Sequence, residues 1–129
     1  MNNLNHLMLT RMLAVYLGQS QGTGEINFRG TTGVELAMAL NHYLKYSTNS
    51  SVSWPQTGGN NINLPTPLPQ PMHKVHVERS TEKHYYANVC TFSYSFAWYT
   101  LADWVREIDW MALNGVNLPL AYTGQWRDV

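Results

Sequence analysis

The chain has 129 residues, of which 44% are apolar, so it can bury a core as one ordinary domain or as one small domain and part of another. Eight basic and eight acidic side chains give a net charge of +0, which excludes the electrostatic footprint of a nucleic-acid or anionic-membrane binder. A single cysteine, Cys90, excludes an internal disulfide framework and zinc sites built from several cysteines.

The N-terminal segment carries apolar residues at helical spacing over 1–17, which predicts an amphipathic helix. Arg11 interrupts the apolar run and no basic segment precedes it, so we expect neither a secretory signal peptide nor a membrane span. Residues 19–25 have the composition of a loop. Ile26–Arg29 then alternates apolar and polar side chains, which predicts a short strand.

A helix is expected after this strand, to about residue 46. Thr32 precedes Glu35 by three positions, which predicts a capping box at the start of the helix. The helix is apolar on most sides, and the polar residues Glu35, His42 and Lys45 lie near one narrow stripe. Such a helix is expected to pack against a sheet or a neighbouring domain.

The next segment combines a reversal of the chain with a proline-rich exit. Residues 52–54 and 62–64 alternate around a Gly- and Asn-rich turn, which predicts a β-hairpin with a longer loop. Pro65, Pro67, Pro69 and Pro71 then predict an extended, semi-rigid stretch and a domain boundary. The expected division is an α+β domain over 1–64, a linker over 65–74 and a second region over 75–129.

The second region contains the clearest helix, expected over 101–114 between an N-cap at Thr100 and a left-handed Gly115. Its predicted apolar face consists of residues at helical spacing: Leu101, Trp104, Val105, Ile108, Met111 and Ala112. Val75–Val77 is expected to be a short strand, and residues 116–122 a strand buried on both faces. A helix, a glycine turn and a buried strand are typical of a parallel α/β sheet or barrel, here begun and not completed.

Three segments closely resemble the α-N-acetylglucosaminidase family of glycoside hydrolases. They are INFRGTTGVELAMALNHYLKY, YYANVCTFSYSF and the long, distinctive block EIDWMALNGVNLPLA. The resemblance runs from about residue 26 to residue 125. It implies an α+β fold class, with a small N-terminal α+β domain followed by the truncated start of a (β/α)₈ barrel.

The resemblance also implies a function for the full-length protein, the removal of terminal N-acetyl-D-glucosamine from α-glucosaminides such as heparan sulfate. It implies a GlcNAc-containing glycan as partner, no cofactor, and a lysosomal or secreted location. Retaining glycosidases need two carboxyl groups about 5–5.5 Å apart. In this family both are glutamates on later barrel strands, so we expect no catalytic residue in this chain and no activity from it alone.

By the same resemblance, Asn88, Cys90 and Tyr94 line the −1 sugar subsite. From the residues alone, Asn88 fits a turn, Cys90 a buried structural thiol and Tyr94 a core position. Asn49 begins the glycosylation sequon Asn49-Ser50-Ser51, which has meaning only in a secreted chain.

Other functional readings stay open. Asp103 and Glu107 share a helix face, but a solvated polar face is expected there instead of an acid pair. A non-catalytic carbohydrate-binding or interaction module would use the rings of Trp54, Trp98 and Trp110. A metal site would need ligands from a histidine group, for which solvated histidines are the expected alternative: His73, His76 and His84.

Overall fold

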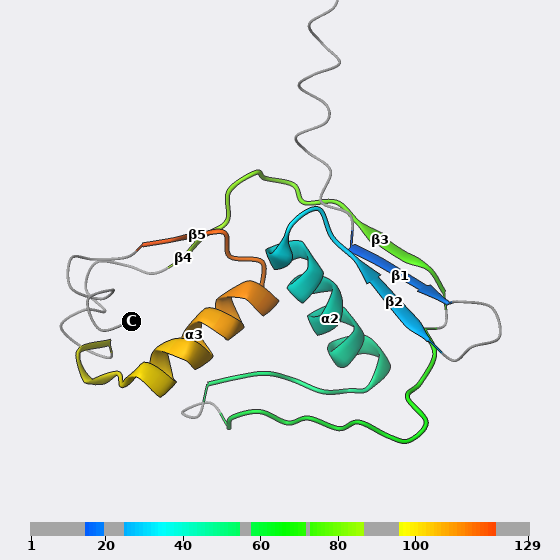
Figure 1. Cartoon of the computed structure of the whole chain (residues 1–129), viewed down its shortest axis with the longest axis horizontal. Coiled ribbons are helices and arrows are strands. Elements are labelled where there is room, and N and C mark those ends of the chain that lie inside the picture. The colour runs from blue at the N-terminus through cyan, green and yellow to red at the C-terminus, as the bar shows by residue number, and fades with distance from the viewer. Residues whose placement is uncertain (1–14, 20–24, 55–57, 72, 87–95, 121–129) are drawn as a thin grey trace, which may run out of the picture.

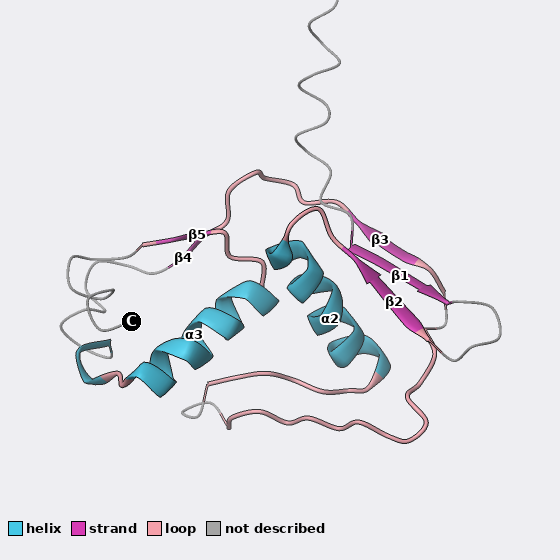
Figure 2. Ribbon diagram, viewed as in Figure 1, coloured by secondary structure: helices cyan, strands magenta, loops and turns pink. Residues whose placement is uncertain are grey.

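The structure is a computed structural model that describes residues 15–19, 25–54, 58–71, 73–86 and 96–120 (Figure 1). The described elements are, in chain order, β1 (Val15–Gln19), β2 (Ile26–Arg29), α2 (Gly33–Ser47), β3 (Val75–Val77), β4 (Tyr85–Tyr86), the 3₁₀ helix η3 (Phe96–Trp98), α3 (Leu101–Leu113) and β5 (Leu118–Pro119). Figure 2 shows two groups, a three-stranded sheet with α2 beside it and a second group around α3. Helices and strands are mixed, as the α+β class requires.

The first group is an antiparallel sheet in the order β2-β1-β3, covered by α2. Leu17 of β1 lies opposite Phe28 on one side and Val75 on the other. Ala39 and Tyr43 of α2 are 0% and 3% exposed, and the Phe28 ring meets the Tyr43 ring edge-on at 5.8 Å. The core of this group therefore lies between α2 and the sheet.

The helix expected over 1–17 is wrong at its C-terminal end, because β1 begins at Val15. Two partner strands are available there, and pairing with them outweighs an amphipathic pattern. The rest of that predicted helix lies outside the described residues.

The start of α2 also differs from the prediction. Thr32 has the extended backbone of an N-cap, but its side chain accepts no hydrogen bond from the helix. Its hydroxyl instead donates to the carboxylate of Glu35, which is 2% exposed and accepts from Arg79 at 3.0 Å. The predicted capping box is therefore wrong, because the Glu35 carboxylate forms a buried ion pair with Arg79.

The predicted hairpin strands do not form. The chain reverses, but its only ladder contact among the described residues is one antiparallel bridge between Ser51 and Asn61, with backbone bonds of 2.8 and 2.9 Å. The oxygen of the Asn60 side chain accepts from the backbone N–H of Ser53 at 3.1 Å. Asn and Ser side chains thus take over backbone groups that a ladder would need.

The proline-rich stretch returns from the α3 side to the sheet along α2 (Figure 1). The Tyr43 hydroxyl donates to the Pro69 carbonyl at 2.8 Å, and Pro71 is buried. The stretch then leads into β3, which pairs antiparallel with β1. Val75–Val77 therefore belongs to the first sheet, although the predicted division placed it in the second region.

The second group is a strand–helix–strand unit. β4 and β5 pair in parallel, with Tyr85 opposite Leu118, and α3 connects them. Thr100 caps α3 as predicted, and its capping box with Asp103 is complete. Gly115 ends the helix at φ 79, which confirms the predicted left-handed glycine.

The two groups meet along α2 and α3. The amide of Asn41 donates to the Leu113 carbonyl at 2.9 Å. A Cβ built at Gly115 would lie 2.5 Å from the sulfur of Met38, so the glycine allows a close approach of the two helices.

The predicted apolar face of α3 is only partly covered, with Trp104, Met111 and Ala112 half-buried. Leu101, Val105 and Ile108 are 56%, 49% and 51% exposed, whereas Glu107 is 3% exposed. The helix turns its aromatic side inward, because the Trp104 ring packs on Phe96 at 5.0 Å. The strand predicted over 116–122 is described only as β5, and Leu118 is 46% exposed, so its expected burial on both faces is wrong for the described chain.

Candidate functional site

The carboxyl end of β4 is the first candidate position, since sites of α/β barrels form where parallel strands end. β4 ends at Tyr86, and Asn88, Cys90 and Tyr94 follow it in sequence. These three residues lie outside the described residues, so their role as sugar ligands stays a prediction.

A buried carboxylate holds the end of β4. The Tyr86 hydroxyl donates to Oε1 of Glu107 at 2.7 Å. Burial, and next the hydrogen bond to Glu107, raise the pKa of Tyr86; burial and then the charge of Glu107 raise the pKa of Tyr99. Both phenols are therefore neutral donors at pH 7, and the carboxylate fixes β4 against α3.

Sequence reasoning missed this role of Glu107, for which a solvated face was expected. The available signal was its place between Trp104 and Trp110, three residues away on either side. This spacing puts the carboxylate on the aromatic stripe of the helix, not on the stripe that contains Leu101 and Val105.

A groove of about 490 Å³ lies between α3 and the chain reversal that precedes β3. We call it the Trp54 groove. Its lining residues are Val52, Ser53, Trp54, Gly59, Asn60, Tyr99, Asp103, Arg106, Glu107, Asp109, Trp110 and Leu113. In Figure 1 the segment after α2 runs toward α3 before it returns to the sheet.

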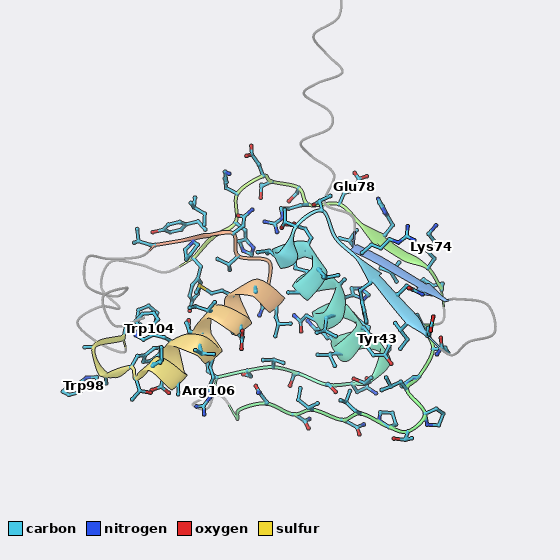
Figure 3. The ribbon with its side chains drawn as sticks, viewed as in Figure 1. Tyr43, Lys74, Glu78, Trp98, Trp104 and Arg106 are labelled. Carbon is cyan, nitrogen blue, oxygen red and sulfur yellow. The ribbon has the colours of Figure 1, made fainter. Side chains whose placement is uncertain are left out.

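Two of the three tryptophans considered for stacking meet in this groove. The ring centroids of Trp54 and Trp110 lie 5.2 Å apart. The Tyr86 ring also packs on Trp110, with 5.2 Å between the two centroids. Trp98 is 84% exposed and lies at the outer end of the second group (Figure 3). The structure therefore joins Trp54 to Trp110 and leaves Trp98 apart.

Asp103 and Glu107 line the same groove in different states. The hydroxyl and backbone N–H of Thr100 bind Asp103 and hold the pKa of its carboxyl below the usual value. An acid with a lowered pKa is ionised at neutral pH and is a poor proton donor. Together with the Tyr86 bond of Glu107, this arrangement favours binding over acid–base chemistry.

The remaining candidate residues are exposed. Asn49 is exposed at φ 52, and the buried Ser50 hydroxyl accepts from the backbone N–H of Asn63 at 2.8 Å. His76 lies 3.3 Å from Glu78. Within the described ranges, no group of three His, Cys, Asp or Glu side chains could hold a metal ion.

Among the described residues, no helix has the length and apolar character that a membrane crossing needs.

Comparisons with known families agree with both groups of elements. The model of the "Alpha-N-acetylglucosaminidase (NAGLU) N-terminal domain" matches residues 11–70, and that of the "Alpha-N-acetylglucosaminidase (NAGLU) tim-barrel domain" matches residues 84–128. Human alpha-N-acetylglucosaminidase is 45% identical over 111 residues, which are 84% of this chain and 14% of the human protein.

Solved structures give the same relation. A family 89 glycoside hydrolase from Clostridium perfringens, in complex with 2-acetamido-1,2-dideoxynojirmycin, superposes with a TM-score of 0.78 at 33% identity, over 88% of this chain and 13% of that one. A variant of the bacterial enzyme with two Glu→Gln substitutions, in complex with its substrate GlcNAc-alpha-1,4-galactose, gives the same TM-score over 12% of its length.

Two family models in the expected order, a 45% identical human relative and a shared fold lead to one conclusion. The chain belongs to the α-N-acetylglucosaminidase family of glycoside hydrolases. It spans a small part of the length of its relatives and matches the family models of their N-terminal and TIM-barrel domains.

Proposed function

We propose that this chain is part of an α-N-acetylglucosaminidase that removes terminal N-acetyl-D-glucosamine from α-glucosaminides such as heparan sulfate. The observation that carries the proposal is the 45% identity to the human enzyme, which runs across both groups of elements. The parallel β4–α3–β5 unit agrees with it, since a (β/α)₈ barrel is built from such units. A lysosomal or secreted location, with Asn49 glycosylated, belongs to the same proposal.

The contribution of this chain is structural and substrate-binding. Asn88 offers a donor and an acceptor to sugar hydroxyls, Tyr94 a ring face and a hydroxyl, and Cys90 a small polarisable wall. All three follow β4, whose end Glu107 holds through Tyr86. The GlcNAc-containing substrate of the bacterial relative is a ligand of the kind that these side chains suit.

The two catalytic carboxyl groups belong to the rest of the barrel. A retaining glycosidase needs them about 5–5.5 Å apart, one as acid/base and one as nucleophile. Asp103 and Glu107 are engaged by Thr100 and Tyr86 and do not supply such a pair. The chain by itself is therefore inactive.

The domain boundary that fits these observations lies after β3. The matched regions end at residue 70 and resume at residue 84, and β3 is part of the first sheet. We place the N-terminal domain up to Val77 and the barrel from His84, with residues 78–83 between them.

A chimaera tests the proposal. The segment of the human enzyme that matches this chain is replaced by residues of this chain, and the hydrolysis of an aryl N-acetyl-α-glucosaminide is measured. We expect an active chimaera. Asn88→Ala should lower its kcat/KM by about 100-fold, since sugar contacts that strengthen in the transition state carry that order of effect. Glu78→Gln, at an exposed side chain, should cause no loss. A folded but inactive chimaera, or turnover by this chain alone, would contradict the proposal.

A further inference from the structure

The Trp54 groove has no part in the proposed hydrolysis, yet it has the construction of a ligand site. We propose that it binds one pyranose ring of a neutral glycan against the wall that Trp54 and Trp110 form. This assignment does not depend on the proposed function, because its evidence is the groove itself.

The aromatic wall is the first argument. Trp54 and Trp110 pack at 5.2 Å with their planes inclined by 47°, and Trp54 remains 37% exposed. Exposed tryptophan rings match the apolar C–H faces of a pyranose. Behind them, Tyr86 contacts Trp110 at 5.2 Å and is itself bound to Glu107. The wall is thus held in place before a ligand arrives, which lowers the entropy cost of binding.

Polar groups around the wall supply the second argument. Asp103, Arg106 and Asp109 lie along the groove on α3, with Arg106 Nη1 at 3.8 Å from Asp103 Oδ1. Asn60 lies on the opposite side, in the chain reversal. Carboxylate and guanidinium groups side by side can accept from one sugar hydroxyl and donate to the next. The groove volume of about 490 Å³ falls within the usual range of ligand sites.

The charge of the lining selects among sugars. Three carboxylates, those of Asp103, Glu107 and Asp109, stand against the single guanidinium of Arg106 in the groove lining. A sulfated or uronic-acid ring would meet repulsion from this excess of negative charge. The lining therefore favours a neutral ring such as N-acetylglucosamine.

Saturation-transfer NMR on the 129-residue chain tests the site, with methyl N-acetyl-α-D-glucosaminide and an N-sulfated glucosamine glycoside as probes. We expect saturable binding of the neutral probe, with a Kd on the order of 1 mM for a single ring, and weaker binding of the sulfated one. Trp54→Ala should weaken the neutral probe by roughly tenfold. Arg106→Ala, at a side chain 67% exposed and harmless to folding, should weaken it by roughly threefold. Trp98→Ala is the matched control and should leave binding unchanged.

Two results would overturn the site. One is the absence of saturable binding to the wild-type chain. The other is binding that survives both Trp54→Ala and Arg106→Ala. If such binding were lost in Asn88→Ala, the sugar would occupy the residues after β4, which supports the proposed function and refutes this groove.

Discussion

The two α-helices in the described part of the chain have similar lengths and similar apolar content, yet α2 buries two apolar side chains almost completely and α3 buries none to that extent. Ala39 and Tyr43 of α2 are 0% and 3% exposed, whereas Leu101 and Ile108 of α3 are 56% and 51% exposed. The difference lies in their neighbours, because α2 has a three-stranded sheet and α3 has a pair of two-residue strands. An apolar stripe thus indicates that a helix face favours packing against other elements, but it does not show that the same chain contains those elements.

The largest expected change in stability comes from the ion pair at the junction between the two groups. Arg79, which follows the first sheet, holds Glu35 of α2 in an ion pair whose side chains are 10% and 3% exposed. Arg79→Met leaves a buried carboxylate without its cation and should lower the free energy of unfolding by about 3–5 kcal/mol. Urea unfolding followed by circular dichroism measures the change.

A double variant provides the control for Arg79. Glu35→Gln removes the charge but keeps an acceptor for the hydroxyls of Thr31 and Thr32, which both donate to Glu35. Glu35→Gln combined with Arg79→Met should therefore recover most of the lost stability. Equal instability of the single and double variants would show that the loss is one of packing and not of charge.

The contact between α2 and α3 can be tested through glycine. Gly115→Ala forces an alanine to φ 79 and places its Cβ 2.5 Å from the Met38 sulfur, so we expect a loss of about 2 kcal/mol. Gly59→Ala is the matched control, since its φ is 73 and nothing lies within 4 Å of the added carbon. It should cost only about 1 kcal/mol. Equal losses would mean that the Met38 side chain moves aside at no cost.

Local signals predicted much of the fold. The strand at Ile26–Arg29, the extents of α2 and α3, the cap at Thr100 and the glycine at 115 all follow from short-range chemistry. The failures depend on distant partners. Val15–Gln19 became a strand because β2 and β3 flank it. Glu35, which was expected to bind the backbone at the start of α2, instead forms an ion pair with Arg79 far along the chain.

The candidate site divides in the same way. The pairing of Trp54 with Trp110 needs the chain reversal to reach α3, which no local pattern encodes. The burial of Glu107 needs Tyr86 as a donor. Asn88, Cys90 and Tyr94 came from family resemblance, and their role stays a prediction.

A pH effect sharpens the description of the covered helix. Burial, and then the positive charges of His73 and Lys45, lower the pKa of His42 below 6.5. The unfolded chain therefore takes up this proton at a higher pH than the folded chain does. Stability should be full above about pH 6.5 and should decrease as the pH falls through the window between the two pKa values.

His42→Phe keeps a ring against Tyr46, where the two ring centroids lie 4.5 Å apart. This variant should flatten the dependence of the free energy of unfolding on pH. Urea unfolding measured from about pH 5 to about pH 7.5, a range that brackets the ordinary histidine pKa, checks the change. His76→Gln is the control, because the His76 side chain is 45% exposed and its removal should leave the slope unchanged. A slope that persists in His42→Phe would assign the effect to other groups.

The smallest expected effect concerns the uncovered stripe of α3, defined by Leu101, Val105 and Ile108. Replacing all three by Gln should change the free energy of unfolding by only about 0.5 kcal/mol per site, since these side chains already contact water. Tyr43→Ala in the covered helix should cost about 3 kcal/mol or more.

The same triple variant should reduce self-association in light scattering, because the chain has few charges, 12% of its residues, to keep exposed apolar stripes apart. If the triple variant instead unfolds as easily as Tyr43→Ala, the stripe is buried in solution, and the contrast between the two helices does not hold.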